Sequence, residues 1–471
     1  MRSVTLDKTQ QAIVDSNAKK ICVVAGAGSG KTRVLIERVA RLLKEGVDPA
    51  SVVCITFTKM AAQEMKTRFK DIPGADNMFI GTIHSYANKM YKKATGKTTD
   101  LLTPEKETQI VGDLIKKYGK HISLSKYKEW CDKRRLKELG FLKQVELDAI
   151  LSEDEKVELY ALLDYKDLKS VFGGNCENIS TDELAGEALA IEKAAKVSEE
   201  YPETVRSVAK KNGIITFNEL LDICQRVSLL QRKPVKYLFV DEFQDIGVFE
   251  YRFLLGLNAE NFFVVGDDYQ AIYSFKGGDF EYFKSLADSK DFETFYLENN
   301  YRCNKKIVDY GNKVISTISD VIPKKCVSKT GGTGQLILEQ GGLSVVKRYV
   351  ELIDPRDYKK WFILTRSNAH MIDISRMLYK MDIPADTFKK GNLNMDSMDK
   401  ILEKNSIKVL TIHSAKGLES DNVLLYGSFP EIPDDNWWDF NGTEGMRIKY
   451  VGVTRARNNL VIVDCSPNSS H

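Results

Sequence analysis

A glycine-rich segment near the N-terminus has the composition of a phosphate-binding loop. Residues 25–32 read Ala-Gly-Ala-Gly-Ser-Gly-Lys-Thr, between the apolar run Ile21–Val24 and the helical pattern Arg33–Leu43. Glycines let the backbone bend so that several N–H groups point at one anion, and the helix adds the positive end of its dipole. Lys31 is expected to bind the β/γ-phosphates of a nucleoside triphosphate, and Thr32 to bind Mg²⁺. The predicted nucleotide-binding residues are Ala25, Gly26, Ala27, Gly28, Ser29, Gly30, Lys31, Thr32 and Arg33.

Two consecutive acids, Asp241 and Glu242, follow the apolar residues Phe239–Val240. Mg²⁺ prefers oxygen ligands and keeps several waters, so Asp241 is predicted to hold the metal ion through water. Glu242 is placed to orient and deprotonate an attacking water. An ordinary acidic turn is the alternative, but the upstream phosphate loop favours the metal site.

Two arginines in the second half could supply positive charge to a γ-phosphate. Arginines delivered from a second domain contribute about 10³–10⁵ to the rate of phosphoryl transfer. The candidates are Arg302, within Asn300–Arg302, and Arg455, within Val453–Ala456. Taken singly, each is better explained as an ordinary arginine in a salt bridge.

The elements that must position these residues follow an alternating pattern. Short β-branched runs, each followed by a helical stretch, occur in two zones and predict α/β domains with parallel sheets covered by helices. The runs are 21–24, 52–57, 237–240 and 262–265 in the first zone, and 361–365, 408–412, 423–426 and 460–463 in the second. Residues 90–212 have helical periodicity instead, which predicts a helical insertion. We expect a first domain of residues 1–89 plus 213–288, and a second of residues 289–471.

Composition limits the classes of protein to consider. The 471 residues are 43% hydrophobic and 29% charged, as in a folded soluble protein, and the net charge of +3 excludes a histone-like binder. Eight cysteines form no Cys-x-x-Cys pair, so reduced thiols are expected and no zinc site is predicted. No signal-peptide core or apolar run of about 18 residues is present, so we expect a cytoplasmic protein.

The motifs together resemble those of superfamily I DNA helicases of the UvrD/Rep/PcrA type. Each motif alone would be weak evidence, but their order extends over nearly the whole chain. The segments that carry the resemblance are Leu6–Gln10, Ala25–Thr32, Ile55–Met65, Gly81–Ser85, Thr216–Leu221, Asp241–Asp245, Gly266–Phe275, Asn300–Arg302, Thr411–Glu419 and Tyr450–Ala456.

The resemblance implies two RecA-like motor domains with ATP and Mg²⁺ between them. It implies that Gln10 recognises adenine, that Tyr301 stacks on it and that Glu419 contacts the ribose. Gln270 would sense the γ-phosphate and link ATP to the DNA groove. The implied catalytic residues are Lys31, Glu242, Gln270, Arg302 and Arg455.

The resemblance also implies a path for single-stranded DNA. Aromatic side chains beside basic residues suit such a groove, because every base has a π-face. Core packing is the alternative for an isolated aromatic residue, and a structural role for His84 and His413. Tyr273 and Phe275 lie two residues apart in a segment expected to be non-helical, so both can face one side. The implied DNA contacts are Phe57, His84, Tyr273, Phe275, Lys276, Arg366, Asn368 and His413.

The chain departs from the family pattern in its second motor domain. A helical subdomain is normally inserted before the motif that begins near Lys408, but here only residues 392–406 are available, enough for a loop or one short helix. We therefore expect a reduced helicase that acts as a monomer on single strands and on junctions with duplex DNA. For the strand-separating hairpin of the family, 321–336 is one candidate position.

The expected activity is ATP-driven, 3′→5′ translocation along single-stranded DNA, coupled to duplex unwinding. Two alternatives stay open. One is a translocase that displaces proteins without productive unwinding. The other is a DNA-stimulated ATPase that acts as a switch.

Overall fold

The computed structural model describes residues 5–102, 106, 214–231, 234–274, 277–388, 395–429 and 443–466. The chain divides into two units, of which the first comprises 1–87, 224–435 and 441–471 and carries both large sheets. The second comprises 88–223 and 436–440, and its described part contains the short parallel pair β4 (Asp100–Leu101) and β5 (Ile214–Ile215). Most of the predicted helical insertion therefore lies outside the described residues.

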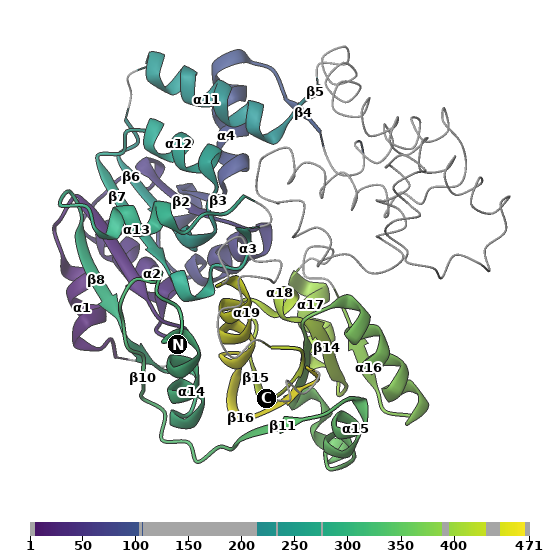
Figure 1. The fold of residues 1–471 in the computed structure, drawn as a ribbon. Helices are drawn as coiled ribbons and strands as arrows, with labels where there is room; N and C mark the ends of the chain where they lie inside the picture. The colour runs from purple at the N-terminus through teal and green to yellow at the C-terminus, as the bar shows by residue number, and fades with distance from the viewer. Residues whose placement is uncertain are drawn as a thin grey trace, which may run out of the picture. The chain divides into compact units, whose positions relative to one another are not determined.

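The first large sheet has six parallel strands in the order β3-β2-β6-β7-β1-β8. All residues of β1 except the first are buried, and all of β2 are, as expected for a parallel sheet covered on both faces. The strands, drawn in purple and teal in Figure 1, are β1 (Lys20–Ala25), β2 (Val52–Thr56), β3 (Phe79–Thr82), β6 (Tyr237–Val240), β7 (Asn261–Gly266) and β8 (Glu293–Leu297).

Two of the helices around this sheet begin at side-chain caps. Asp7 and Gln10 form a reciprocal capping box at the start of α1, and Thr58 caps α3 through its side chain. The helices are α1 (Lys8–Asp15), α2 (Lys31–Lys44), α3 (Lys59–Phe69), α4 (Ile83–Thr95), α11 (Phe217–Gln231), α12 (Val248–Gly256) and α13 (Glu281–Ala287), with 3₁₀ turns η1 (Pro49–Ser51), η2 (Ala75–Asn77), η4 (Phe243–Asp245) and η5 (Asp268–Gln270).

The second large sheet is also parallel, in the order β11-β16-β15-β12-β14-β13. Its strands are β11 (Leu336–Gln340), β12 (Trp361–Thr365), β13 (Ala385–Thr387), β14 (Ile407–Thr411), β15 (Ser420–Gly427) and β16 (Ala456–Asp464). The helices of this half are α14 (Lys305–Ile315), α15 (Leu343–Glu351), α16 (Asn368–Lys380), α17 (Met395–Glu403), α18 (Ile412–Ala415) and α19 (Glu444–Val453), with the 3₁₀ turn η7 (Pro355–Lys360). Between β13 and β14, the described residues contain one helix, the short α17.

The predicted α/β class with two parallel sheets is confirmed, and two details of the prediction are wrong. β8 pairs with β1 and so belongs to the first sheet, although these residues were assigned to the second domain. The segment 321–336 forms no hairpin, because its two-residue strand β10 (Val327–Ser328) pairs in parallel with β9 (Asn299–Asn300). The predicted position of the strand-separating hairpin is therefore wrong.

Within the described residues, no helix combines the length and the apolar character needed to cross a membrane. Six cysteines lie in this part of the chain as free thiols, and five of them are buried.

Candidate active site

The carboxyl ends of the parallel strands bring the predicted nucleotide residues to one edge of the first sheet. The glycine-rich loop follows β1, Asp241 and Glu242 follow β6, and Gln270 lies in η5 after β7. Ligands of open α/β sheets bind at this edge, outside the carboxyl ends of the strands. The three motifs are thus neighbours because β1, β7 and β6 are neighbours in the sheet.

The loop adopts a backbone that favours glycine at two positions. Gly28 has a φ of +64° and Gly30 a φ of +87°. A Cβ atom on Gly28 would also lie 2.7 Å from the Cβ of Arg302. The Ser29 hydroxyl donates to the Gly26 carbonyl (2.7 Å), which tightens the turn.

The segment Asn300–Arg302 is hydrogen-bonded to this loop. The Asn300 side chain donates to the Ala27 carbonyl (2.8 Å), and the Tyr301 backbone N–H donates to the Gly28 carbonyl (2.9 Å). The Asn300 Oδ1 atom in turn accepts from the backbone N–H groups of Arg302 and Cys303. The loop and Arg302 are therefore held in one hydrogen-bonded turn.

Asp7 brings together the two residues predicted to contact adenine. Its carboxylate accepts from the Gln10 backbone N–H (2.8 Å), the Tyr301 hydroxyl (2.5 Å) and the Asn299 amide (2.9 Å). Burial acts to raise the pKa of Asp7, but these hydrogen bonds lower it below its ordinary value. The Gln10 side chain donates to the Ser29 carbonyl (2.9 Å), so the predicted base-binding end is joined to the loop.

The predicted metal and catalytic side chains are in contact. The Thr32 hydroxyl donates to Asp241 (2.9 Å), and the Lys31 ammonium lies 3.5 Å from the Glu242 carboxylate. Burial and the charge of Glu242 raise the pKa of Asp241. Burial would also raise the pKa of Glu242, but Lys31 and Lys416 hold it well below its usual value. Glu242 is therefore ionised at neutral pH.

Glu242 is also held in a strained backbone conformation, with a φ of 55°. A non-glycine residue in the left-handed region costs about 1–3 kcal/mol and persists only where surrounding contacts determine it. The Gln244 amide supplies one such contact, donating to Glu242 (2.7 Å) while its oxygen accepts from the Asp267 backbone (2.9 Å). Such strain is concentrated at functional sites.

Gln270 makes contacts in two directions. Its side chain donates to Asp267 (2.6 Å) and accepts from Arg455 (2.9 Å). Its backbone carbonyl accepts from the ammonium of Lys416 (2.7 Å), which also donates to both oxygens of Asp245 (2.7 and 2.6 Å). Gln270 thus joins an arginine predicted to reach ATP to a lysine from another motif.

The two predicted arginine fingers lie in different surroundings. Arg302 is ion-paired with Glu419, which also pairs with Arg457. Arg455 is 1% exposed and donates to neutral acceptors, among them the carbonyls of Val451 (2.9 Å) and Leu418 (3.2 Å). Burial and the charge of Arg302 lower the pKa of Arg455 to about 10, which leaves it charged at neutral pH. The charges of Arg302 and Arg455 therefore act on each other, and Glu419 balances that of Arg302.

Three of the predicted DNA contacts form an aromatic cluster. The rings of Phe57 and Tyr273 are stacked, with centroids 5.6 Å apart, and the His413 ring lies 6.3 Å from Tyr273. The ammonium of Lys416 lies 4.6 Å from the centroid of the Tyr273 ring. The lysine that contacts Gln270 therefore also contacts the aromatic cluster.

The other predicted DNA contacts follow different strands. Arg366 and Asn368 come shortly after β12, and His84 comes shortly after β3. The Nε2 atom of His84 lies 3.9 Å from the Glu250 carboxylate. Burial lowers the pKa of His84 against the opposing effect of Glu250. Phe275 and Lys276 lie outside the described residues.

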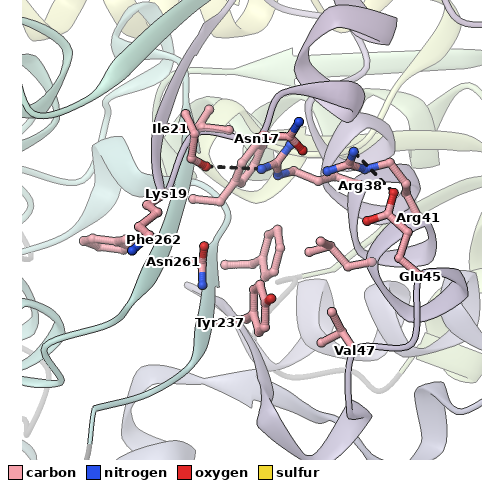
Figure 2. Close-up of a pocket in the computed structure, with 14 residues that line it drawn as sticks. Asn17, Lys19, Ile21, Arg38, Arg41, Glu45, Val47, Tyr237, Asn261 and Phe262 are labelled. Atoms are coloured by element: carbon pink, nitrogen blue, oxygen red, sulfur yellow. Dashed lines mark hydrogen bonds and ion pairs between the residues drawn. The ribbon is translucent and has the colours of Figure 1, made fainter.

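A pocket of about 280 Å³ lies at the opposite edge of the first sheet, at the amino ends of β1, β6 and β7. Figure 2 shows Arg38 and Arg41 beside this pocket, with Tyr237 and Asn261 among its lining residues. It is therefore separate from the predicted nucleotide site. The buried Arg38 donates to the carbonyls of Ile13 (2.8 Å), Val14 (3.2 Å) and Ser16 (2.7 Å), and so caps the C-terminal end of α1.

Replacing Arg38 with methionine is expected to destabilise the attachment of α1 to α2. The substitution leaves buried carbonyls without their charged donor, so the free energy of unfolding should fall by about 2–3 kcal/mol. Urea titration monitored by circular dichroism measures this change. Glu37→Met, at the exposed neighbouring position, should stay within about 0.5 kcal/mol of the unmodified protein. Equal stabilities of the two variants would contradict the capping role.

Comparison with known proteins identifies the family. The model of the UvrD/REP helicase N-terminal domain matches residues 6–292, more than half of the chain, and that of the UvrD-like helicase C-terminal domain matches residues 386–467. The chain belongs to the UvrD/REP helicase family. The protein is therefore an ATP-dependent DNA helicase, which is a hydrolase.

Curated relatives cover almost the whole chain. A probable DNA helicase of Mycoplasma pneumoniae is 28% identical over 98% of the chain and 84% of its own length. DNA helicase IV of Escherichia coli is 24% identical over 98% of the chain and 68% of its own length. The ATP-dependent DNA helicase PcrA of Staphylococcus epidermidis is 26% identical over 98% of the chain, and the match covers 59% of the length of PcrA.

Sequence reasoning did not assign roles to several residues that the structure places at this site. Asp7, Asp245 and Lys416 all lie inside quoted motifs, but spacing alone gave no sign of their contacts. Lys416 and Asp245 are 171 positions apart, so only the fold brings them together.

Proposed function

We propose that the helicase binds ATP between its two motor domains and uses hydrolysis to move 3′→5′ along single-stranded DNA, separating duplex DNA ahead of it. The single observation that supports this coupling is the double contact of Gln270. Its side chain meets Asp267 and Arg455, and its carbonyl meets Lys416, which lies over the ring of Tyr273. One residue is thus within hydrogen-bonding distance of both a predicted ATP contact and a neighbour of the predicted DNA cluster.

Binding of ATP would draw charges from both halves of the site onto its phosphates. Lys31 would bind from the glycine-rich loop, and Arg302 and Arg455 would bind from the other side. Phosphate bound to Lys31 would loosen the ion pair of Lys31 with Glu242, which would make the Glu242 carboxylate more basic. Glu242 would then orient and deprotonate the attacking water.

The residues around Thr32 fit a divalent metal ion. The Thr32 hydroxyl and the Asp241 carboxylate lie 2.9 Å apart, and Mg²⁺ prefers such oxygen ligands while keeping waters and substrate phosphates as the others. Within the described residues no cluster of three or more His, Cys, Asp or Glu side chains could hold a metal ion. When bound, Mg²⁺ would neutralise charge on the β- and γ-phosphates.

Adenine selection is proposed for the end of the site near Asp7. Gln10 would recognise the base edge and Tyr301, which is 45% exposed, would stack on the ring. Both residues are tied to Asp7, so their spacing is set before ATP arrives. Glu419, which is paired with Arg302 and Arg457, would contact the ribose.

Single-stranded DNA is proposed to cross the carboxyl ends of β2, β3, β12 and β14, where the predicted DNA contacts lie. Bases would stack on Phe57 and Tyr273, and the sequence tolerance of stacking suits a motor that must pass over any sequence. Changes at Gln270 and Lys416 on closure around ATP would shift this cluster, so that each cycle of closing and opening becomes a step.

Replacing Tyr273 with alanine is expected to weaken the binding of single-stranded DNA and to uncouple ATP turnover from it. Loss of one stacked base raises the dissociation constant by about 5- to 150-fold, from roughly 1–3 kcal/mol per stack. Fluorescence anisotropy with a labelled oligothymidine measures this constant. Tyr379→Ala, at an 86% exposed tyrosine on α16, is the matched control and should bind as the unmodified protein does. Unchanged binding by Tyr273→Ala would argue against the proposed groove.

Strand displacement tests the proposed function directly. Duplexes with either a 3′ or a 5′ single-stranded tail are incubated with and without ATP, and release of the shorter strand is followed. The proposal predicts ATP-dependent release from the 3′-tailed duplex and little from the 5′-tailed one. Displacement of a strand-bound protein without duplex separation would indicate the translocase alternative. ATP turnover that does not depend on strand length would indicate the switch.

A monomer is proposed as the active species, because only α17 is described where relatives of this type carry a large inserted subdomain. Unwinding per molecule should then be independent of protein concentration under single-turnover conditions. Unwinding that requires dimerisation or an added partner would contradict a monomeric motor.

A further inference from the structure

Lys324, a lysine whose side chain is fully buried, contacts the same aspartate as Gln270 and has no role in the function proposed above. Its ammonium is 3.2 Å from one oxygen of Asp267, pairs with Asp268, and lies 3.4 Å from the centroid of the Tyr269 ring. The side chains of Lys324, Asp267 and Asp268 are all 0% exposed. The Tyr269 hydroxyl donates back to the Lys324 carbonyl (2.8 Å), so the lysine is held at both its backbone and its side chain.

Burial alone would lower the pKa of Lys324, but Asp268 and Asp267 raise it above its ordinary value, so the lysine is charged. The ammonium of Lys324 thus balances the charge of two buried carboxylates. Because it holds one oxygen of Asp267, it also fixes the orientation of that carboxylate.

The orientation of the Asp267 carboxylate determines which way the Gln270 amide faces. One oxygen of Asp267 is taken by Lys324, and the other accepts from the Gln270 NH₂ group (2.6 Å). With its NH₂ group held there, the Gln270 oxygen faces Arg455 and accepts from it (2.9 Å). Without Lys324, the Asp267 carboxylate could rotate, and the Gln270 oxygen would no longer be held in one position opposite the Arg455 guanidinium.

We propose that Lys324 is a positioning residue for ATP hydrolysis, which acts by holding the Asp267 carboxylate in place and so fixing the Gln270 amide toward Arg455. The inference rests on the proposed function, since it concerns the residues that would respond to the γ-phosphate. It adds the segment after α14 to the site, a segment that none of the motifs contains. A misplaced group near the reacting phosphate costs on the order of 10²-fold in rate, so this contact can govern turnover.

The test uses a pair of variants that keep the buried charge balanced. Lys324→Met alone would leave two buried aspartates unpaired and risks unfolding the protein. Lys324→Met combined with Asp268→Asn leaves one buried negative charge, as in the unmodified cluster of one lysine and two aspartates. Asp268→Asn alone is the matched control, because it retains the contact of Lys324 with Asp267. Lys325→Met, at the adjacent exposed lysine, controls for loss of a charge from this segment.

The measurements are kcat and KM for ATP with saturating oligothymidine, together with the melting temperature. We expect the double variant to lose about tenfold or more in kcat relative to Asp268→Asn, with KM for ATP within about threefold, because positioning acts on the transition state. Lys325→Met should match the unmodified protein. In a Gln270→Ala background, the same pair should differ by less than about twofold, since residues that act as one unit are not additive.

Two results would overturn the inference. One is equal kcat for the double variant and Asp268→Asn. The other is a full loss that persists in the Gln270→Ala background, which would mean that Lys324 acts through the fold and not through Gln270. If the proposed function itself is wrong, the ATP turnover of the unmodified protein will not respond to DNA.

Discussion

Replacing Lys31 with alanine is expected to abolish ATP turnover while leaving single-stranded DNA binding measurable. Lys31 is the one lysine of the glycine-rich loop, and it lies 3.5 Å from Glu242 at the carboxyl edge of the first sheet. Loss of one preorganised charge at a phosphate costs about 10²–10³-fold in kcat or more, because nothing else replaces it in a partly dry site. The aromatic cluster at Phe57 and Tyr273 does not include Lys31, so DNA should still bind.

Steady-state release of phosphate, with and without oligothymidine, measures the loss, and anisotropy measures the retained DNA affinity. Lys44→Ala, at the exposed last residue of the same helix, is the matched control and should turn over ATP normally. The assignment of residues 25–32 as the ATP site does not survive if Lys31→Ala keeps its turnover. Parallel loss of DNA binding and of thermal stability would point to misfolding instead.

Replacing Arg455 with alanine should slow ATP turnover far more than it weakens ATP binding. Arg455 is charged, 1% exposed, and bonded to the side chain of Gln270. An arginine that meets charge developing in the transition state is worth about 10³–10⁵ in kcat, whereas ground-state binding uses many other contacts. A fall in kcat with little change in the dissociation constant for ATP is therefore expected.

Binding of a non-hydrolysable ATP analogue, followed by calorimetry, is compared with kcat for each variant. Arg455→Lys, which keeps the charge but not the planar fork, should also be slow, because a single ammonium cannot reproduce the paired hydrogen bonds. Arg348→Ala, at an exposed arginine of α15, is the control. Similar losses in affinity and in kcat would contradict the finger role of Arg455.

The interior of both sheets could be predicted from the sequence, and their edges could not. All eight predicted strands are interior strands, whereas β3, β8, β11 and β13 were missed and are the four edges of the two sheets. An edge strand has a neighbour on one side only, so its residues need not be uniformly apolar. β8 shows this, because only its last residue is buried, in contrast to the nearly continuous burial of β1. A search for apolar β-branched runs therefore finds the centre of a parallel sheet and loses its boundaries.

The candidate site follows the same division between local and distant information. The glycine-rich loop, the acidic pair and the two arginines could be predicted from the sequence, because each belongs to a short motif of neighbouring residues. The contacts of Asp7 with Tyr301 and of Lys416 with Asp245 join residues 294 and 171 positions apart, and no spacing rule specifies them. Glu419 shows the limit of transfer by motif, because the structure pairs its carboxylate with Arg302 and Arg457 and leaves its predicted ribose contact untested.

The two contacts of Gln270 belong to different parts of the residue, and this has a consequence for genetics. The contact with Arg455 uses the side chain, whereas the contact with Lys416 uses the backbone carbonyl. The contact with Lys416 should therefore survive any substitution at position 270 that leaves the backbone in place. Mutations there should therefore behave as separation-of-function alleles, which lose the response to ATP but keep the lysine anchored beside the aromatic rings.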